Sequence, residues 1–472
     1  MATSKCIIDV FMSLGGRNVP AGTLVFACSR GQTSCSFSYS ETWLAMPGTF
    51  ELDPSLPLVP GFAHVPQKQE MHGCFADSCP DRWGRNLLRR HCLKNGLPAP
   101  GPADFLLGVA DASRSGAFRF RLQDSQEWLS PQATGVPKAK TLSEFAAIVR
   151  AYEKDGLDSD FKDLLVPGTS LGGARPKLSL ESPRDGSLWM AKFPSLNDEE
   201  DVCLLEKLNY DAATACGIAV PETRLYRLKT GRHILLSRRF DRRQGPDGTV
   251  LRIPYASAMT LLGARDGSSE EYSYADLAMA MQEQGGEPAT SCRELWRREL
   301  FNVLAGNRDD HLRNHGFLRH ADGWRPSPAF DLECAKGKRT HALALNVEGC
   351  TEPDMEAVLA AAEWFGIAPR DALADARRFA ETVSLFSGRN FCLDRGLSAS
   401  DRAALEESRD GVRWPEFFAG ERIRRGTASL QDGQAGSTTA NADAGSRPEP
   451  GPVPASDAKD EPEEEAGPQP GM

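Results

Sequence analysis

The sequence lacks the patterns that would assign it to several common classes of protein. Its twelve cysteines are scattered, with no C-x-x-C pair and no cysteine–histidine cluster at zinc-finger spacing. No apolar run approaches a membrane span, and residues 1–17 lack the apolar core of a signal peptide. These absences favour a reduced cytoplasmic protein without membrane contact, in which cysteines such as Cys203 and Cys216 are small core residues.

The net charge of −10 is distributed unevenly over the 472 residues. From Gln431 onward nine acidic residues stand against two basic ones, so this tail carries −7 and leaves −3 for the rest. A nearly balanced body gives no electrostatic reason to expect direct binding of nucleic acid or membranes. The tail has hardly any large apolar residue, and we therefore expect residues 426–472 to be disordered.

The rest of the chain alternates between strand-like and helix-like stretches in three predicted regions. An N-terminal subdomain, residues 1–125, begins with strands and contains a helix near 78–95 that Gly96 and Pro98 stop. Residues 126–240 contain two predicted hairpins, 177–193 and 223–239, on either side of a helix over 201–216. Residues 241–425 are mainly helical, with helices expected over 274–284, 293–305, 354–364, 370–385 and 400–407.

A polar loop in the third region carries the residues that point to chemistry. The helix before it is expected to end at Gly306, with Glu294 and Glu299 facing solvent. An apolar strand follows from Gly316, and a turn at 321–323 allows a hairpin whose return strand, 329–331, ends in Asp331.

Three polar residues of this stretch match the needs of phosphoryl transfer. Asp309 could accept the proton of an attacking hydroxyl, while Asn314 and Asp331 offer hard oxygen ligands for magnesium beside nucleotide phosphates. The alternative is a solvated loop in which Asp309 and Asn314 only cap a turn. A metal-dependent hydrolase built on Asp309, Asp310 and His311 is a further alternative, although no second histidine stands at helical spacing.

Further candidates lie in the second region. The stretch SLGGARPKLSL, residues 170–180, could hold phosphate through backbone N–H groups and Lys177, or be a plain glycine turn. Lys192 stands in an apolar strand and needs a partner if it is buried, for which Glu206 on the next helix is a candidate. Otherwise Lys192 points outward from an edge strand and Glu206 is solvated. The backbone of RRFD, residues 238–241, could form an adenine-binding hinge, or its letters could reflect a surface Arg–Asp pair.

Together these stretches resemble the HipA-like serine/threonine kinases. SLGGARPKLSL, LWMAKF, ACGIAVPE, LSRRFDR, GNRDDHLRNHGF and SPAFDLE occur in that family's order and approximate spacing. The stretches FSYSETWL, DRWGRNLLRR and DFLLGVADASRSGAFRF are similar to the family's N-terminal subdomain, so the resemblance covers roughly residues 5–420. It implies a bacterial protein with an α+β, two-lobed, protein-kinase-like fold: a β-rich N-lobe, an extra N-terminal subdomain and an all-helical C-lobe.

The resemblance also implies roles for individual residues. Asp309 would be the catalytic base, and Asn314 and Asp331 would hold Mg²⁺. The residues placed at ATP are Leu171, Gly172, Gly173, Ala174, Lys177, Lys192, Glu206, Arg238, Phe240, Asp241, His311 and Phe330. Ser170 stands where family members phosphorylate themselves; a phosphate adds about −1.5 to −2 charge, which would eject the glycine loop and stop the enzyme.

The family resemblance extends to partners. Such kinases are often toxins restrained by a small helix-turn-helix antitoxin, so DNA would be reached only through that partner, and the substrate would be a protein serine or threonine. An alternative is a catalytically silent kinase fold that binds a DNA-bound regulator. Two departures from the family pattern are Arg238, where many members carry an acid, and the acidic tail.

Overall fold

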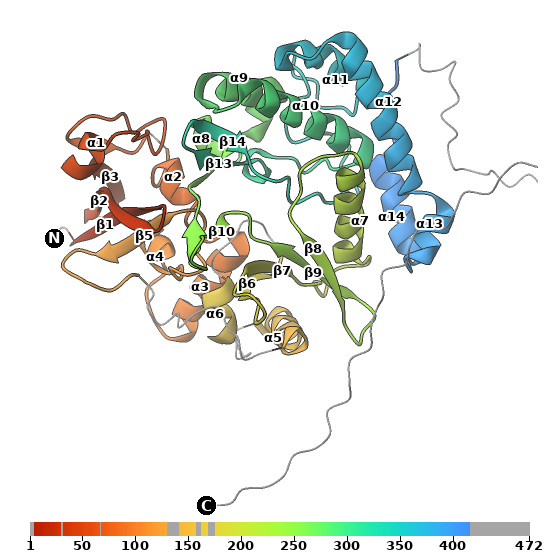
Figure 1. Ribbon diagram of the computed structural model, residues 1–472. Coiled ribbons are helices and arrows are strands. Elements are labelled where there is room, and N and C mark those ends of the chain that lie inside the picture. Colours follow the sequence, from red (N-terminus) through yellow and green to blue (C-terminus); the bar gives the residue numbers. More distant parts are fainter. Residues whose placement is uncertain are drawn as a thin grey trace, which may run out of the picture. The chain divides into compact units, whose positions relative to one another are not determined.

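The structure is a computed structural model that describes residues 4–29, 32–66, 68–129, 141–156, 162–168 and 175–415 (Figure 1). The predicted glycine loop and the predicted acidic tail lie outside these residues. Within the described ranges, no helix is long and apolar enough to cross a membrane.

An antiparallel sheet of five strands forms the N-terminal subdomain, in the order β4-β3-β2-β1-β5. Its strands are β1 (Ser4–Leu14), β2 (Arg17–Ser29), β3 (Gln32–Tyr39), β4 (Phe62–His64) and β5 (Phe118–Leu122). Gly15 and Gly16 both have positive φ, which is the backbone that a two-residue turn between β1 and β2 requires. Alternate residues of β1, such as Ile8 and Val10, are buried in the apolar cluster that packs on this sheet.

The N-terminal subdomain also contains four helices, of which α3 packs on the second sheet. They are α1 (Glu41–Ala45), α2 (Gly73–Ala76), α3 (Arg82–Lys94) and α4 (Pro102–Leu107). Helix α3 is capped by Asp81, whose Oδ1 accepts the Gly84 N–H at 2.6 Å. Trp83 and Leu87 on its buried face join the apolar cluster of the second sheet, so α3 attaches the N-terminal subdomain to the next region.

The second sheet has four antiparallel strands in the order β6-β7-β9-β8. They are β6 (Lys177–Glu181), β7 (Leu188–Lys192), β8 (Thr223–Arg227) and β9 (His233–Arg238), close to the two predicted hairpins. Between the hairpins runs α7 (Val202–Ala215), whose sequence prediction is also confirmed. Helices α5 (Leu142–Asp155) and α6 (Lys162–Gly168) contribute Phe145, Val149 and Leu164 to the sheet's apolar cluster.

The third region is built around one long buried helix, α10 (Pro288–Ala305). It contacts α9 (Tyr274–Gln284), α11 (Met355–Ala361) and α12 (Pro369–Leu385), and Figure 1 shows it among them. Gly306 ends α10 in the left-handed conformation, as expected. The expectation that Glu299 faces solvent is wrong, because α10 is covered on most sides and Glu299 is fully buried.

Further helices complete this region, which is not purely helical. They are α8 (Ala258–Leu261), α13 (Arg389–Asp394) and α14 (Ala399–Arg409), with short 3-10 turns at Ser269–Glu271, Leu312–Asn314 and Ala362–Phe365. The prediction of an all-helical lobe needs correction, because five short strands also lie here. These are the hairpin β10 (Arg242–Gln244) and β11 (Val250–Arg252), and a sheet of β12 (Tyr255–Ser257), β13 (Gly316–His320) and β14 (Gly323–Pro326).

A buried carboxylate ties the N-terminal subdomain to this third region. Asp77, which follows α2, accepts the backbone N–H of Ser257 at 2.7 Å and the hydroxyls of Ser257 and Thr260, each at 2.8 Å. Together with the packing of α3 on the second sheet, this contact means that the N-terminal subdomain holds on to both neighbouring regions.

Candidate active site

The three regions meet at a cleft of about 610 Å³. Its wall from the N-terminal subdomain includes Asp81 and the α3 arginines Arg82, Arg85 and Arg89. Its second wall, from the second sheet and the chain after it, includes Met190, Arg238 and Phe240. The third region contributes His311, Asn314, Phe330 and Asp331. Candidates that are far apart in the sequence therefore share one cavity.

Lys192, the last residue of β7, is buried and paired. Its Nζ lies 2.7 and 2.8 Å from the two carboxylate oxygens of Glu206 on α7. Lys192 is 3 % exposed and Glu206 only 1 %, so the ammonium needs this carboxylate. The predicted pairing is confirmed, and the outward-facing alternative is wrong.

Asp331 is a second partner of Lys192, from a position the sequence did not predict. The hairpin returns as β14, directly after the turn at Ala321 and Asp322, and its last bond to β13 is from the Ser327 N–H to the Gly316 oxygen at 2.8 Å. Asp331 lies beyond it with φ of 61°, and its backbone N–H donates to the Tyr210 hydroxyl at 3.0 Å. This backbone directs its carboxylate onto Lys192 Nζ.

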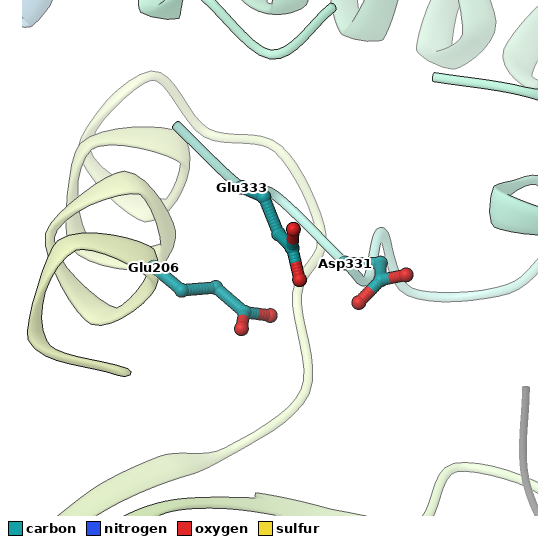
Figure 2. A group of neighbouring side chains, drawn as sticks. All are labelled: Glu206, Asp331 and Glu333. Atoms are coloured by element: carbon teal, nitrogen blue, oxygen red, sulfur yellow. The ribbon is translucent and has the colours of Figure 1, made fainter. Parts of the chain in front are cut away.

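A third carboxylate, Glu333, lies beside the first two. One oxygen atom from each of Glu206, Asp331 and Glu333 lies within 4.8 Å of the others, and Figure 2 shows the three side chains converging from α7 and from one extended segment. Glu333 Oε1 is 3.8 Å from Lys192 Nζ. Arg175 Nε also lies 3.8 Å from Glu333 Oε1, so three carboxylates stand against two cations, and these oxygens are the ligand type that a divalent cation such as Mg²⁺ prefers.

The pKa values show which of these groups hold their protons. Burial raises the pKa of Glu206 to about 7, although Lys192 opposes that shift. For Asp331 burial also works toward a higher value, but Lys192 and Lys177 outweigh it and hold the pKa below its usual range. Burial disfavours the charged form of Lys192, yet Asp331 and Glu206 raise its pKa well above the ordinary value. Asp331 therefore stays ionised at neutral pH and can serve as a ligand for a cation.

Asp309 and Asn314 lie in the loop that follows α10. The amide nitrogen of Asn314 donates to the backbone oxygen of Asp309 at 2.8 Å, so its amide oxygen is left as the atom for a cation. The carboxylate of Asp309 is partly exposed and pairs with Lys338. His311 lines the cleft, and its buried Nδ1 has no hydrogen-bond partner in the described part of the chain.

The neighbouring Asp310 faces away from this chemistry. Its carboxylate accepts from the Tyr274 hydroxyl at 2.6 Å, lies 3.1 Å from His341 Nδ1, and accepts the Ala342 N–H at 3.0 Å. Burial acts to raise its pKa, but His341 and Tyr274 lower it to about 2. Asp310 is thus saturated by protein donors, which contradicts a hydrolase centre built on Asp309, Asp310 and His311.

Lys177 on β6 is also buried, and its partner comes from the N-terminal subdomain. Its Nζ lies 3.7 Å from Asp81 Oδ2, and this oxygen has no hydrogen-bond partner among the described residues. Burial raises the pKa of Asp81 to about 7, with Lys177 acting in the opposite direction. The capping residue of α3 therefore also belongs to the cleft.

The predicted hinge follows β9. Phe240 packs against Phe330 at 5.6 Å between ring centroids, which gives the cleft an aromatic wall. The carboxylate of Asp241 is fully used, since it accepts from Arg239, from Arg242 at 2.8 Å and from the Gly116 N–H at 2.8 Å. Asp241, expected to bind the nucleotide, thus ties the hinge to the N-terminal subdomain instead.

The exposed side chain of Arg238 reaches Glu222 at 3.5 Å, which leaves the backbone at this position in the cleft wall for the predicted hinge. The remaining candidates, Ser170, Leu171, Gly172, Gly173 and Ala174, lie outside the described residues.

Three residues that line the cleft or contact its candidate residues escaped the sequence reasoning. Glu333 stands two residues after Asp331, and this spacing puts side chains of an extended segment on one side, so the signal was present in FDLE. Asp81 and Lys338 gave no local signal, because their partners are far away in the sequence.

Comparisons with known proteins agree with this geometry. The profile of the HipA N-terminal domain matches residues 15–113, and that of the HipA-like C-terminal domain matches residues 169–385. The putative kinase Y4mE of Sinorhizobium fredii (strain NBRC 101917 / NGR234) is 27 % identical over 322 residues, which are 63 % of this chain and 71 % of that protein.

The solved Shewanella oneidensis MR-1 complex of HipA, HipB and operator DNA contains a similar chain. The TM-score is 0.61 at 17 % identity, over 85 % of this chain and 95 % of that one. The fold is therefore the predicted α+β, kinase-like fold. With matches to both of its domains, the chain belongs to the HipA-like family.

Proposed function

We propose that this protein is an ATP- and Mg²⁺-dependent kinase that transfers the γ-phosphate of ATP to a serine or threonine hydroxyl of a protein. The observation that carries the proposal is the buried contact of Lys192 with Glu206 and Asp331. This contact borders a cleft that Asn314 also lines, and Asp309 stands in the loop leading to Asn314. A phosphate-binding lysine held by a helix glutamate, beside a metal-binding aspartate, is the arrangement that protein kinases use.

The oxygen donors fit a magnesium ion. Asp331 offers an ionised carboxylate and Asn314 an amide oxygen, both on the wall of one cleft. Magnesium, when bound, neutralises charge on the nucleotide's phosphate oxygens. Because the carboxylates near Lys192 outnumber its single positive charge, binding of the cation would relieve their mutual repulsion.

The other candidates would bind and orient the two substrates. Lys177 and Lys192 would contact phosphate oxygens, and the Phe240 and Phe330 rings would pack against the adenine. The Asp309 carboxylate would accept the proton of the acceptor hydroxyl as the oxygen attacks the γ-phosphorus. Most of the rate acceleration would come from positioning and charge neutralisation.

Family membership also supports proposals on regulation and partners. The Shewanella relative is solved with HipB and operator DNA, and we propose a DNA-binding antitoxin partner for this chain as well. Self-phosphorylation of Ser170, just ahead of the glycines, would place a phosphate where the loop must receive ATP.

Intact-mass spectrometry of the purified protein before and after addition of Mg·ATP tests the proposal, with Asp309→Asn in parallel. We expect one added phosphate on Ser170 in the wild type and none in the variant, which should still bind ATP. If the starting mass shows that the protein already carries phosphate, that phosphate would be removed with a phosphatase before the assay.

Nucleotide binding without any phosphorylated product in the dephosphorylated wild type would refute the kinase and favour the silent module. Equal phosphorylation of wild type and Asp309→Asn would refute the assignment of Asp309. Release of free phosphate without a phosphoprotein would instead support a hydrolase.

A further inference from the structure

Residues 308–310, which precede the 3-10 turn Leu312–Asn314, each contact one short segment, residues 338–342. Arg308 Nη1 donates to the backbone oxygen of Lys338 at 2.5 Å. Asp309 pairs with the ammonium of the same Lys338. Asp310 binds His341 and the Ala342 N–H. The contact of Asp309 with Lys338 is thus flanked on both sides by a second link between the same two chain segments.

The flanking links are buried, while the central pair is partly exposed. Arg308, Asp310 and His341 are 5 %, 1 % and 4 % exposed. An exposed ion pair contributes little to stability by itself, and a long lysine side chain would not be held by it. Here buried contacts fix both backbones, so the position of Lys338 opposite Asp309 is built into the fold.

Phosphoryl transfer creates a need for a cation at this position. Asp309 is an anion that must approach the anionic γ-phosphate closely, and the two repel each other. Lys177 and Lys192 pair with Asp81, Glu206 and Asp331, and among the described residues neither lysine contacts the Asp309 carboxylate. Within the described part of the chain, Lys338 is the one cation in contact with the Asp309 carboxylate.

We propose that Lys338 is a further catalytic residue, whose ammonium contacts the transferred phosphoryl group beside Asp309. This inference rests on the proposed kinase function. An ammonium has three donors, so it can keep one bond to Asp309 and donate another to a phosphoryl oxygen. The acceptor hydroxyl lies within hydrogen-bond reach of Asp309 when it attacks, which brings the phosphoryl group within reach of Lys338.

The step balances without any further reactant. The acceptor O–H bond breaks and its proton goes to the Asp309 carboxylate, while the acceptor oxygen forms a bond to the γ-phosphorus. The bond from that phosphorus to the bridging oxygen breaks, and ADP leaves with the electron pair. Lys338 stays protonated throughout and donates hydrogen bonds to the phosphoryl oxygens as their charge redistributes.

The test compares Lys338→Met and Lys338→Arg with Lys336→Met as a matched control. Lys336 is an exposed lysine two residues away that pairs with Glu199 and Glu200 rather than with Asp309. The probes are Mg·ATP and the chain's own acceptor hydroxyl in the dephosphorylated full-length protein. The rate of phosphate incorporation is followed by intact mass over a series of ATP concentrations.

For Lys338→Met we expect the maximal rate constant to fall about 10²–10³-fold, the usual effect of removing one transition-state donor. The ATP concentration for half-maximal rate should change less than about threefold, because the residue acts on the transferred group. Lys338→Arg should recover part of the rate, and Lys336→Met should match the wild type. Unchanged thermal unfolding would show that the loss is not structural.

A maximal rate in Lys338→Met equal to or above that of the wild type would overturn the inference, since the pair of Lys338 with Asp309 would then contribute nothing to transfer. A loss confined to ATP affinity would overturn it too. Both results leave the kinase function standing, whereas a wild type that transfers no phosphate refutes that function together with this inference.

Discussion

Lys177 of the second sheet and Asp81 of the N-terminal subdomain, which lines the cleft, form an ion pair of 3.7 Å. Both residues are buried, so water does not solvate either charge and each depends on the other as its partner. The N-terminal subdomain therefore supplies an electrostatic partner to a lysine that we assign to ATP, in addition to a wall of the cavity. Four predictions follow. Three concern Asp81, Asp331 and Lys192 at the cleft, and one concerns Glu299 on the buried helix α10.

Asp81→Asn should make the protein's stability less dependent on pH. The folded pKa of Asp81, about 7, lies above its ordinary value of 3.8, so the folded state retains this proton while the unfolded state loses it. The wild type should therefore lose stability relative to the variant as pH rises from about 4 to 7, by roughly 2–4 kcal/mol, with no further change above that. Asparagine still caps α3, so the cap is kept.

Urea unfolding of both proteins at pH 5, 6, 7 and 8 measures this difference. A gap between the two curves that stays constant over this range would mean that the pKa of Asp81 is not raised.

Asp331→Asn should weaken the use of magnesium. The variant keeps an oxygen ligand but loses the ionised carboxylate, so we expect a higher Mg²⁺ concentration for half-maximal phosphorylation and at least a tenfold lower rate. A magnesium titration of the phosphorylation rate measures both quantities. Glu333→Gln, which removes the neighbouring carboxylate of the same cluster, should have a smaller effect. Equal effects of the two variants would contradict the assignment of Asp331, rather than Glu333, as the main carboxylate ligand of the cation.

Lys192→Met should destabilise the fold at neutral pH as well as weaken ATP binding. It leaves Glu206 and Asp331 buried without their cation, and breaking such a pair costs about 3–5 kcal/mol. Adding Glu206→Gln removes one uncompensated charge, so the double variant should regain part of the lost stability without regaining ATP affinity. Chemical unfolding and nucleotide titration of the single and double variants separate the two effects. A double variant less stable than Lys192→Met would contradict the pairing.

Glu299→Met should stabilise the protein at pH 8. Both carboxylate oxygens of Glu299 are buried without a hydrogen-bond partner among the described residues, and burial with the nearby Asp310 raises its pKa well above 4.5. The folded state therefore holds a proton that the unfolded state releases above that pH, so stability falls as pH rises. We expect a gain of about 1–3 kcal/mol at pH 8 that shrinks toward pH 4.

Glu283→Met on the exposed surface of α9 is the control for this gain and should have little effect. A loss of stability in Glu299→Met would indicate that the carboxyl group has a partner after all.

The sequence predicted contacts best where the two residues lie on elements that follow one another in the chain. Lys192 and Glu206 lie on a strand and the following helix, so their pairing could be predicted from chain order and burial. Glu299 could not be placed correctly, because an amphipathic pattern assumes one solvent face and α10 has other elements around it. Asp81 and Lys338 become visible only once the tertiary contacts bring distant segments together. Asp331 lies in the cleft but was assigned to the wrong element, since β14 ends at Pro326 and Asp331 follows in irregular chain.

The attachments of the N-terminal subdomain have a mechanical consequence. Asp77 binds the third region, while Trp83, Leu87 and the Asp241 contact with Gly116 bind the second sheet and the hinge. A subdomain attached to both lobes should resist rotation of one lobe against the other. We therefore expect the width of the cleft to change little on substrate binding, with local adjustments of side chains and loops in place of a hinge rotation.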